Sequence, residues 1–258
     1  MSVEFSVADR VARVTINRPE RMNAVDAATE NRLEEIWVEI EGRDDISCVV
    51  LTGAGEKAFS AGADMKGGSG KSGLDYWAEG RSNGFGGLAF RSSLTVPVVA
   101  RVNGYALGGG FEMVLGCDIV IAAEHARFGL PEARVGRLPL DGGMVLLQRK
   151  IPFNQAMGMM LTGRQVGAAK MAEYGIVNEV VPQDELDAAV DRWVADIVAC
   201  APLSLRAIKQ TVQRTAHLNP SEAQALRTSA LIKALNSEDS LEGVAAFVEK
   251  RAPVWRGR

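Results

Sequence analysis

Short apolar runs of strand length constrain the fold of this 258-residue chain more than any other feature. Residues 11–16 and 48–52 have strand character, and residues 96–102 and 119–123 are apolar almost throughout. Strands that are apolar on both faces must be covered on both sides, as in a parallel sheet between layers of helices. Helical spacing of apolar residues follows the candidate N-cap Asp26. The pattern therefore predicts an α/β core.

Helical periodicity dominates the second half of the chain. It predicts one short strand at 176–181 and helices at 144–149, 154–162, 168–174 and 184–200. Beyond Pro202 only helices are predicted, at 203–217, 220–235 and 240–250. We therefore predict a core at residues 1–200 and a helical module at residues 201–258, which either packs on the core or mediates subunit assembly.

The charge balance excludes several classes of partner. The 29 basic and 32 acidic residues give a formal net charge of -3, without the basic patch that nucleic acid or an acidic membrane surface requires. We expect no secretory leader, because residues 1–10 lack the pattern of a charged segment followed by an apolar one, and no apolar run approaches the roughly 18 residues of a membrane span. We expect a cytoplasmic protein without nucleic-acid or membrane partners.

Cysteine and histidine are too few and too scattered for several kinds of site. Cys48, Cys117 and Cys200 form neither a disulfide framework nor a metal pair, and we interpret them as reduced core residues. His125 and His217 offer little to a metal site or a Ser-His-Asp triad. Acid–base chemistry is therefore expected to use carboxylates, with no metal.

Two nucleotide-binding patterns are incomplete. The string GSGKS at residues 68–72 lacks the first glycine of a P-loop, because Met65 stands at that position. The string GAGEKA at residues 53–58 matches a relaxed dinucleotide pattern, but Phe59, Ser60 and Gly62 interrupt the helix that must follow. A nucleotide-binding or purely assembling protein remains an alternative from a different class. The glycine-rich residues 62–87 predict a mobile loop that covers a site.

Glycines and isolated acids mark the candidate site. Three successive glycines, Gly108 to Gly110, end a predicted strand and begin a helix, where unsatisfied amide groups can hold an oxyanion. The same glycines also permit tight helix packing. Glu112 lies in the first turn of this helix, where it either complements the helix dipole or acts in catalysis. Glu132 follows 20 residues later, after one buried strand, so the chain can bring both carboxylates to one place for proton transfer beside a carbonyl.

Several blocks, in order along nearly the whole chain, resemble the crotonase family and most closely its enoyl-CoA hydratase branch. The blocks are residues 18–24, 59–66, 103–112, 128–132 and 237–251. The resemblance implies an α/β spiral of ββα units with a C-terminal helical trimerisation module. It also implies a homo-oligomer, either a trimer or a dimer of trimers.

The resemblance also implies a reaction, the hydration of a 2-enoyl-CoA to a 3-hydroxyacyl-CoA. The backbone amides of Ala63 and Gly109 would hold the thioester carbonyl in an oxyanion hole. Glu112 would act mainly as the base on water, and Glu132 would deliver the proton to the α-carbon. No cofactor is required, since coenzyme A is part of the substrate.

For the CoA moiety, the resemblance assigns a group of residues around the adenine and pantetheine: Met22, Ala24, Ala61, Asp64 and Met65. Lys66 would lie near the phosphates, and Phe247 and Lys250 would reach the site from a neighbouring subunit. The residues themselves also fit a simpler interpretation, in which Lys66 is a solvated charge and Phe247 packs a helix.

The chain departs from many hydratases at residues 137–143, which place bulky Leu140 and acidic Asp141 beside the expected site. Asp141 either caps the following helix or faces the substrate. Residues 249–258 resemble the branch that hydrates crotonobetainyl-CoA, so a branched, polar or aromatic acyl group is an open alternative to a straight chain. Double-bond isomerisation and thioester hydrolysis are the alternative reactions within the family.

Overall fold

A computed structural model describes residues 1–65 and 72–258 and contains two sheets. The larger sheet has the order β1-β2-β3-β5-β7-β10, and only its β1–β2 pair is antiparallel. Its strands are β1 (Val3–Ala8), β2 (Val11–Ile16), β3 (Cys48–Gly53), β5 (Val98–Val102), β7 (Ile119–Ala123) and β10 (Glu179–Val181). The four apolar runs predicted as strands are confirmed, and β1 and its hairpin were not predicted.

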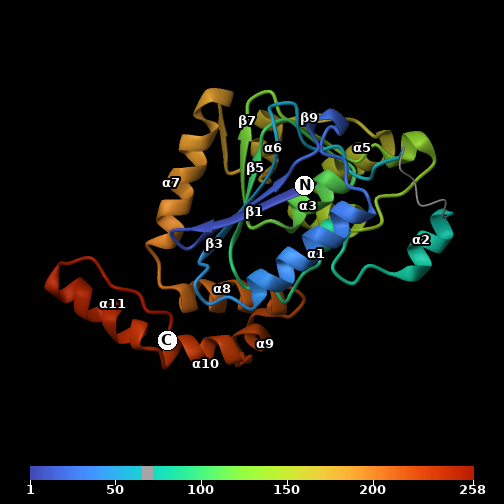
Figure 1. Cartoon of the computed structure of the whole chain (residues 1–258). Helices are drawn as coiled ribbons and strands as arrows, with labels where there is room; N and C mark the ends of the chain where they lie inside the picture. Colours follow the sequence, from blue (N-terminus) through green and yellow to red (C-terminus); the bar gives the residue numbers. More distant parts are fainter. Residues whose placement is uncertain (66–71) are drawn as a thin grey trace.

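Both faces of the larger sheet are covered, which explains its continuous apolar runs. On one face Val49 and Leu51 join the cluster of α1 (Ala27–Glu41). On the other face Cys48 and Val50 join the cluster of α7 (Leu186–Val198). Alternate residues of β3 therefore pack into different layers, and the α/β prediction is confirmed (Figure 1).

The smaller sheet is formed by strands that each follow a strand of the larger sheet or a helix. It contains β4 (Ala58–Ser60), β6 (Tyr105–Leu107), β8 (Arg127–Gly129) and β9 (Val166–Gly167) in that order. Three consecutive strand pairs, β3–β4, β5–β6 and β7–β8, each give one strand to each sheet. The latter two pairs lead into α3 (Gly109–Gly116) and the 3-10 helix η3 (Glu132–Val135). This is the predicted spiral of ββα units.

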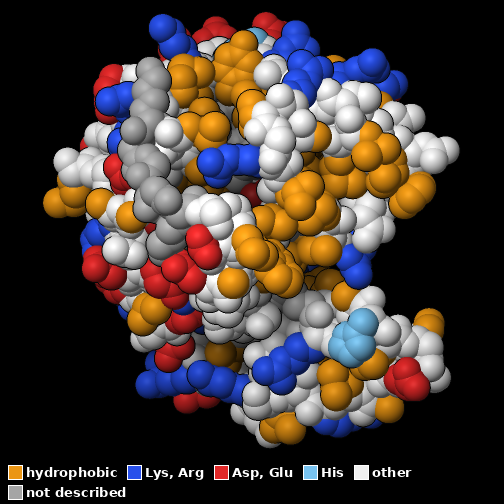
Figure 2. Space-filling view, turned by 90° about the vertical axis from the view of Figure 1, so that its right-hand side faces the viewer, with side chains coloured by type: hydrophobic (Ala, Val, Ile, Leu, Met, Phe, Trp, Pro, Cys, Tyr) orange, Lys and Arg blue, Asp and Glu red, His pale blue; other side chains and the backbone are white. Residues whose placement is uncertain are grey.

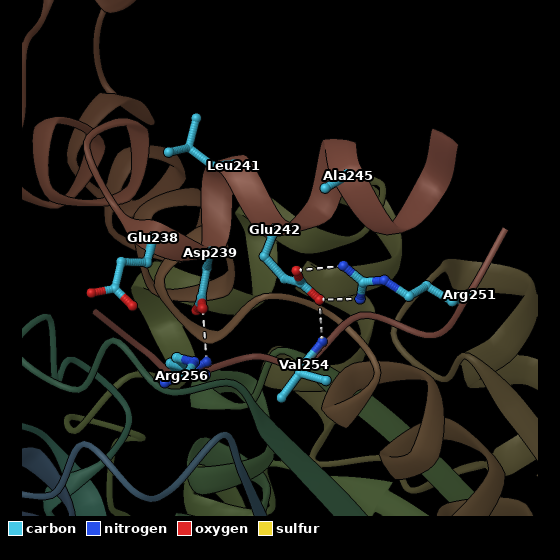
Figure 3. Close-up of a pocket in the computed structure, with 8 residues that line it drawn as sticks. All are labelled: Glu238, Asp239, Leu241, Glu242, Ala245, Arg251, Val254 and Arg256. Atoms are coloured by element: carbon cyan, nitrogen blue, oxygen red, sulfur yellow. Dashed lines mark hydrogen bonds and ion pairs between the residues drawn. The ribbon is translucent and has the colours of Figure 1, made fainter. Parts of the chain in front are cut away.

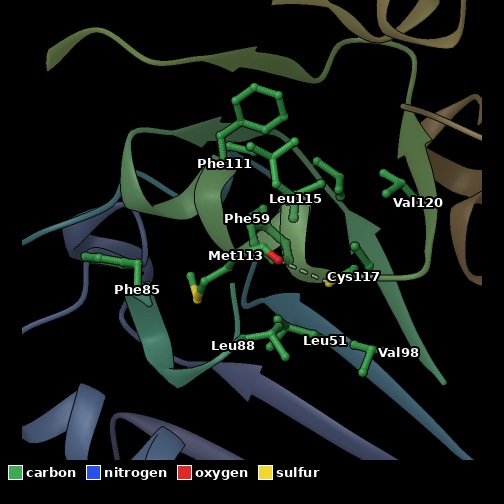
Figure 4. Close-up of a cluster of buried hydrophobic side chains, with 14 of the residues drawn as sticks. Leu51, Phe59, Phe85, Leu88, Val98, Phe111, Met113, Leu115, Cys117 and Val120 are labelled. Atoms are coloured by element: carbon green, nitrogen blue, oxygen red, sulfur yellow. Dashed lines mark hydrogen bonds between the residues drawn. The ribbon is translucent and has the colours of Figure 1, made fainter. Parts of the chain in front are cut away.

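Helix α3 is fixed by its apolar side chains. Phe111 packs edge-to-face on Phe128 of β8, with ring centroids 5.6 Å apart. Met113 and Leu115 are buried in the same cluster (Figure 4). Because the helix is anchored along its length, its first turn is a rigid place for a functional side chain.

The remaining helices complete the chain. They are η1 (Pro19–Arg21), α2 (Gly73–Glu79), η2 (Phe85–Gly87), α4 (Gly143–Lys150), α5 (Phe153–Thr162), α6 (Ala168–Tyr174), η4 (Gln183–Glu185), α8 (Pro202–Thr215), α9 (Pro220–Ala225), α10 (Ser229–Leu235) and α11 (Glu238–Glu249). Figure 1 shows α8 to α11 beyond one end of the larger sheet. Lys209 of α8 reaches back to Asp118 at 2.7 Å and to the Val96 carbonyl at 2.9 Å. The described helices include none long and apolar enough to cross a membrane.

Three local predictions were wrong. Residues 220–235 form two helices, because α9 ends at Ala225 and Thr228 caps a new helix, α10. The stretch 62–87, predicted as a loop, contains α2, which Ser72 and Asp75 begin with a capping box. Cys48 and Cys117 are buried as predicted, whereas Cys200 is exposed because it follows the last turn of α7.

Candidate functional site

Two segments far apart in sequence lie side by side at the edge of the candidate site. Ala61 donates its N–H to the Met22 carbonyl at 3.0 Å, and Asp64 donates to the Val25 carbonyl at 2.9 Å. Val25 and Ala63 form a parallel bridge. Four residues predicted to bind CoA are therefore close together: Met22, Ala24, Ala61 and Asp64. A cavity of about 330 Å³ adjoins this pairing and is lined in part by Met22.

The Arg18 side chain bonds to both of these segments. This contact was not predicted from the sequence. Its Nη2 lies 2.9 Å from Asp64 Oδ2 and 3.0 Å from Asp26 Oδ2, and its Nη1 donates to the Ala24 carbonyl. The Arg18 side chain is only 16% exposed, so these bonds form in a partly desolvated environment, where they are stronger than at the surface. The sequence offers one indication of this contact, namely the arginine at the start of the block at residues 18–24.

The second side of the site is the turn from β6 into α3. A methyl group on Gly62 would lie 2.9 Å from the Gly109 nitrogen, so the segment with Ala63 lies directly against this turn. Within the described chain, the backbone N–H groups of Ala63 and Gly109 have no hydrogen-bond acceptor. A free donor at the N-terminus of α3, with a second free donor on the neighbouring segment, is suited to a developing negative charge.

The glycines of this turn also serve packing. A methyl group on Gly110 would lie 2.1 Å from the Ser60 carbonyl oxygen, and one on Gly109 would lie 2.5 Å from the ring of Phe85. Gly108 has a φ of 55°, in the left-handed region. Close packing and exposure of amide groups are therefore both properties of the same sequence.

Glu112 is buried beside this turn, with 3% of its surface exposed. Its Oε1 accepts the backbone N–H of Asp141 at 3.0 Å and that of Gly143 at 2.8 Å. The pKa of Glu112 is raised to about 8, mainly by burial; the negative charges of Asp141 and Glu132 contribute to the rise, and the two N–H donors oppose it. A carboxyl group with this pKa exchanges protons near neutral pH.

Glu132 faces the same turn from the start of η3. A methyl group on Gly108 would lie 3.0 Å from Glu132 Oε1. The other oxygen, Oε2, is buried and lacks a hydrogen-bond partner among the described residues. Burial also raises the pKa of Glu132. A buried, unsatisfied carboxyl oxygen is costly for stability, and such atoms are typical of functional sites.

Asp141 does not cap α4, so that prediction was wrong. The N-cap residue is Gly142, without a side-chain cap, because the Asp141 carboxylate turns away and accepts the hydroxyl of Tyr76. Asp141 is 8% exposed, and burial raises its pKa against the effects of Tyr76 and Arg81. The neighbouring Leu140 is half-buried.

The other residues predicted to bind CoA are exposed, distant or not described. Met65 is 61% exposed, and Lys66 lies outside the described residues. Phe247, 85% exposed, and Lys250 lie at the end of α11, which Figure 1 shows far from α3. Phe247 and Lys250 therefore do not reach the site within one chain, and their arrival from a neighbouring subunit stays a prediction.

A larger cavity of about 670 Å³ lies between α11 and the C-terminal tail (Figure 3). Two of its acids are hydrogen-bonded: Glu242 accepts two bonds from the Arg251 side chain and one from the Val254 N–H, and Asp239 accepts the Arg256 backbone N–H at 2.7 Å. These bonds hold the tail against α11, and the acids used in them are not available for acid–base chemistry.

Comparisons of this chain with a family model, with curated proteins and with solved structures all find enzymes whose names refer to CoA thioesters. Residues 6–258 match the model of a family described as enoyl-CoA hydratase/isomerase. Carnitinyl-CoA dehydratases of Shigella flexneri and Escherichia coli strain K12 are 39% identical over 252 residues, covering 96% of this chain and 95% of theirs. The crystal structure of an enoyl-CoA hydratase from Bacillus anthracis covers both chains completely, with a TM-score of 0.93 and 32% identity. One from Mycobacterium tuberculosis H37Rv has a TM-score of 0.89 and 32% identity, covering 100% of this chain and 99% of its own.

Proposed function

Because this chain belongs to the enoyl-CoA hydratase/isomerase family, we propose that it adds water across the 2,3 double bond of a 2-enoyl-CoA to give a 3-hydroxyacyl-CoA. Membership confirms the crotonase resemblance predicted from the sequence. The observation that carries the proposal is the meeting of Glu112 and Glu132 beside the free amides of Ala63 and Gly109.

The amides act on the thioester carbonyl. When water attacks the β-carbon, negative charge moves onto the carbonyl oxygen, and the N–H groups of Ala63 and Gly109 stabilise it. Removal of one such donor typically costs about 10²- to 10³-fold in rate. The close packing of Gly110 on Ser60 and Gly109 on Phe85 holds the donors in place.

The two glutamates divide the proton transfers. Oε1 of Glu112 is held by two backbone N–H groups, so Oε2 is left to accept a proton from the attacking water. Glu132, with its raised pKa, donates its proton to the α-carbon as the new C–O bond forms. Glu112 ends protonated and Glu132 ionised, and exchange with solvent restores both groups.

The test is the loss of conjugated enoyl-thioester absorbance when the purified protein meets crotonyl-CoA. Glu112→Gln and Glu132→Gln are expected to lose about 10²- to 10⁴-fold in kcat. Glu124→Gln, an exposed acid between β7 and β8, is the matched control and retains the rate. Hydration by Glu132→Gln near the wild-type rate contradicts the assigned role, and isomer or free acid as product favours the alternative reactions.

A second candidate is reversible hydration with a polar acyl group. The carnitinyl-CoA dehydratases named above support it, as does the polar pair of Asp141 and Tyr76 beside Glu112. The test compares water loss from carnitinyl-CoA and from 3-hydroxybutyryl-CoA. A preference of tenfold or more for carnitinyl-CoA favours the second candidate, and the reverse preference favours a simple acyl chain.

Assembly into a homo-oligomer, either a trimer or a dimer of trimers, is part of the same proposal. Large apolar side chains are exposed on α10 and α11: Ile232, Leu235, Leu241, Val244, Phe247 and Val248. Figure 2 shows a further gathering of hydrophobic side chains across the middle of one face. Such surfaces are typical of subunit contacts. Light scattering of the wild type and of Phe247→Asp tests this, and an unchanged monomeric mass in both contradicts it.

A further inference from the structure

Helix α2 is largely exposed on the surface of the protein. None of its residues is buried, and Leu74 and Trp77 are 71% and 63% exposed. Tyr76 is the half-buried exception, and its hydroxyl donates to Asp141 Oδ2. Figure 1 shows α2 projecting from the molecule on the side of α3 and α5.

Asp141 joins this contact to the candidate site. Its carboxylate accepts the Tyr76 hydroxyl, while its own backbone N–H donates to Glu112 Oε1 at 3.0 Å. Two residues further along, Gly143 donates the second N–H to the same oxygen. Tyr76 therefore reaches Glu112 through one intervening residue, although 36 positions separate them in sequence.

The Tyr76 ring is itself held from a different element. The Arg81 guanidinium lies 4.4 Å from the ring centroid, and Arg81 forms an ion pair with Glu30 of α1. Burial and the Asp141 charge raise the pKa of Tyr76, so its hydroxyl stays protonated and remains a donor. Asp141 would otherwise be a buried carboxylate without a direct side-chain donor within the described residues, which is unfavourable.

We propose that Tyr76 is a positioning residue, which acts through the Asp141 carboxylate on the segment 139–143 whose backbone N–H groups orient Glu112. The role rests on the proposed function, because it takes Glu112 as the reacting carboxylate. Small displacements of a reacting group cost up to about a hundredfold in rate. The exposed helix α2 is in this way linked to the reaction centre.

Kinetics with crotonyl-CoA, measured at the same pH for all variants, test this link. Tyr76→Phe removes only the hydroxyl and is expected to lower kcat about tenfold, with KM changed less than about twofold. Trp77→Phe on the same helix is the matched control and retains kcat. Asp141→Asn keeps an oxygen that accepts the same hydrogen bond and retains most of kcat, whereas Asp141→Ala does not.

A double-mutant cycle of Tyr76→Phe with Asp141→Ala separates coupling from independent effects. If the proposal is correct, the double variant is no slower than Asp141→Ala alone. Losses that multiply, or a Tyr76→Phe effect confined to KM, overturn it.

Hydrogen exchange provides a readout that needs no activity. Tyr76→Phe is expected to speed amide exchange of a peptide covering residues 139–143 several-fold, while Trp77→Phe leaves it unchanged. Unchanged exchange in Tyr76→Phe overturns the positioning role. A wild type that hydrates no enoyl-CoA contradicts the proposed function instead, and exchange then decides the positioning role separately.

Discussion

The backbone N–H of Gly143 donates to Oε1 of Glu112 at 2.8 Å, across 31 residues of sequence. This bond joins the start of α4 to the first turn of α3 and fixes the direction of a buried carboxylate. A methyl group on residue 143 would lie 3.2 Å from the same oxygen, so glycine keeps the approach open. The effect of burial on the pKa of Glu112 exceeds the opposing effect of this hydrogen bond, and the pKa is raised to about 8.

This pKa predicts how hydration depends on pH. Since Glu112 must be ionised to accept a proton and Glu132 must be protonated to donate one, kcat/KM is expected to pass through a maximum, with one limb of the profile set by the Glu112 pKa of about 8. The charge of Asp141 contributes to the raised pKa, so Asp141→Asn moves this limb to lower pH. The profile of crotonyl-CoA hydration measures the shift, with the exposed Asp187→Asn as control. An unmoved limb in Asp141→Asn contradicts the electrostatic coupling.

The raised pKa of Glu112 also predicts that replacing this acid by a neutral residue stabilises the folded protein. The folded-state pKa of about 8 exceeds the ordinary 4.5, so the folded protein favours protonated Glu112 and loses stability as pH rises between these values. Glu112→Gln removes this loss. Its thermal midpoint is expected to exceed that of the wild type by several degrees at pH 8 and to match it near pH 4.5, as scanning calorimetry at both values can show. A smaller gain at pH 8 than at pH 4.5 contradicts the raised pKa.

Arg18 is expected to maintain the geometry of the segment that carries Ala63. Arg18→Ala releases Asp64 and Asp26 from their shared guanidinium and leaves both acids without this partner. We expect kcat/KM for crotonyl-CoA to fall about tenfold or more, because the segment 61–64 loses its anchor. Arg21→Ala, an exposed arginine of η1, is the matched control. Equal kinetics in the two variants rule out the anchoring role.

The C-terminal tail is expected to stabilise α11. Asp239 is 2% exposed and accepts the N–H groups of Arg256 and Gly257 at 2.7 and 2.9 Å (Figure 3). Asp239→Ala leaves both donors without this acceptor and should cost about 1–3 kcal/mol in the free energy of unfolding. Glu238→Gln alters only an exposed pair and should cost less than about 1 kcal/mol. Urea denaturation compares the two, and a smaller loss in Asp239→Ala speaks against the tail contact.

Local patterns were sufficient for much of the fold. The apolar runs at residues 11–16 and 119–123 coincide with β2 and β7, and Asp26 caps α1 through the Thr29 N–H. These features depend on neighbours in sequence, which is why periodicity and capping reveal them. The break between α9 and α10 was missed, because helical composition continues across residues 226–228 and only the Thr228 cap marks it.

The candidate site also has residues that the sequence revealed and contacts that it did not reveal. Gly108 to Gly110, Glu112 and Glu132 could be selected from the chain, since an acid and a glycine run at a strand end have a chemical meaning without neighbours. The contacts of Tyr76 with Asp141 and of Arg18 with Asp64 span 65 and 46 residues. Such pairs exist only after the layers have packed and brought distant loops together. Sequence periodicity and motif chemistry thus specify the elements and the reacting groups, while packing decides how those groups are oriented and which pKa values they acquire.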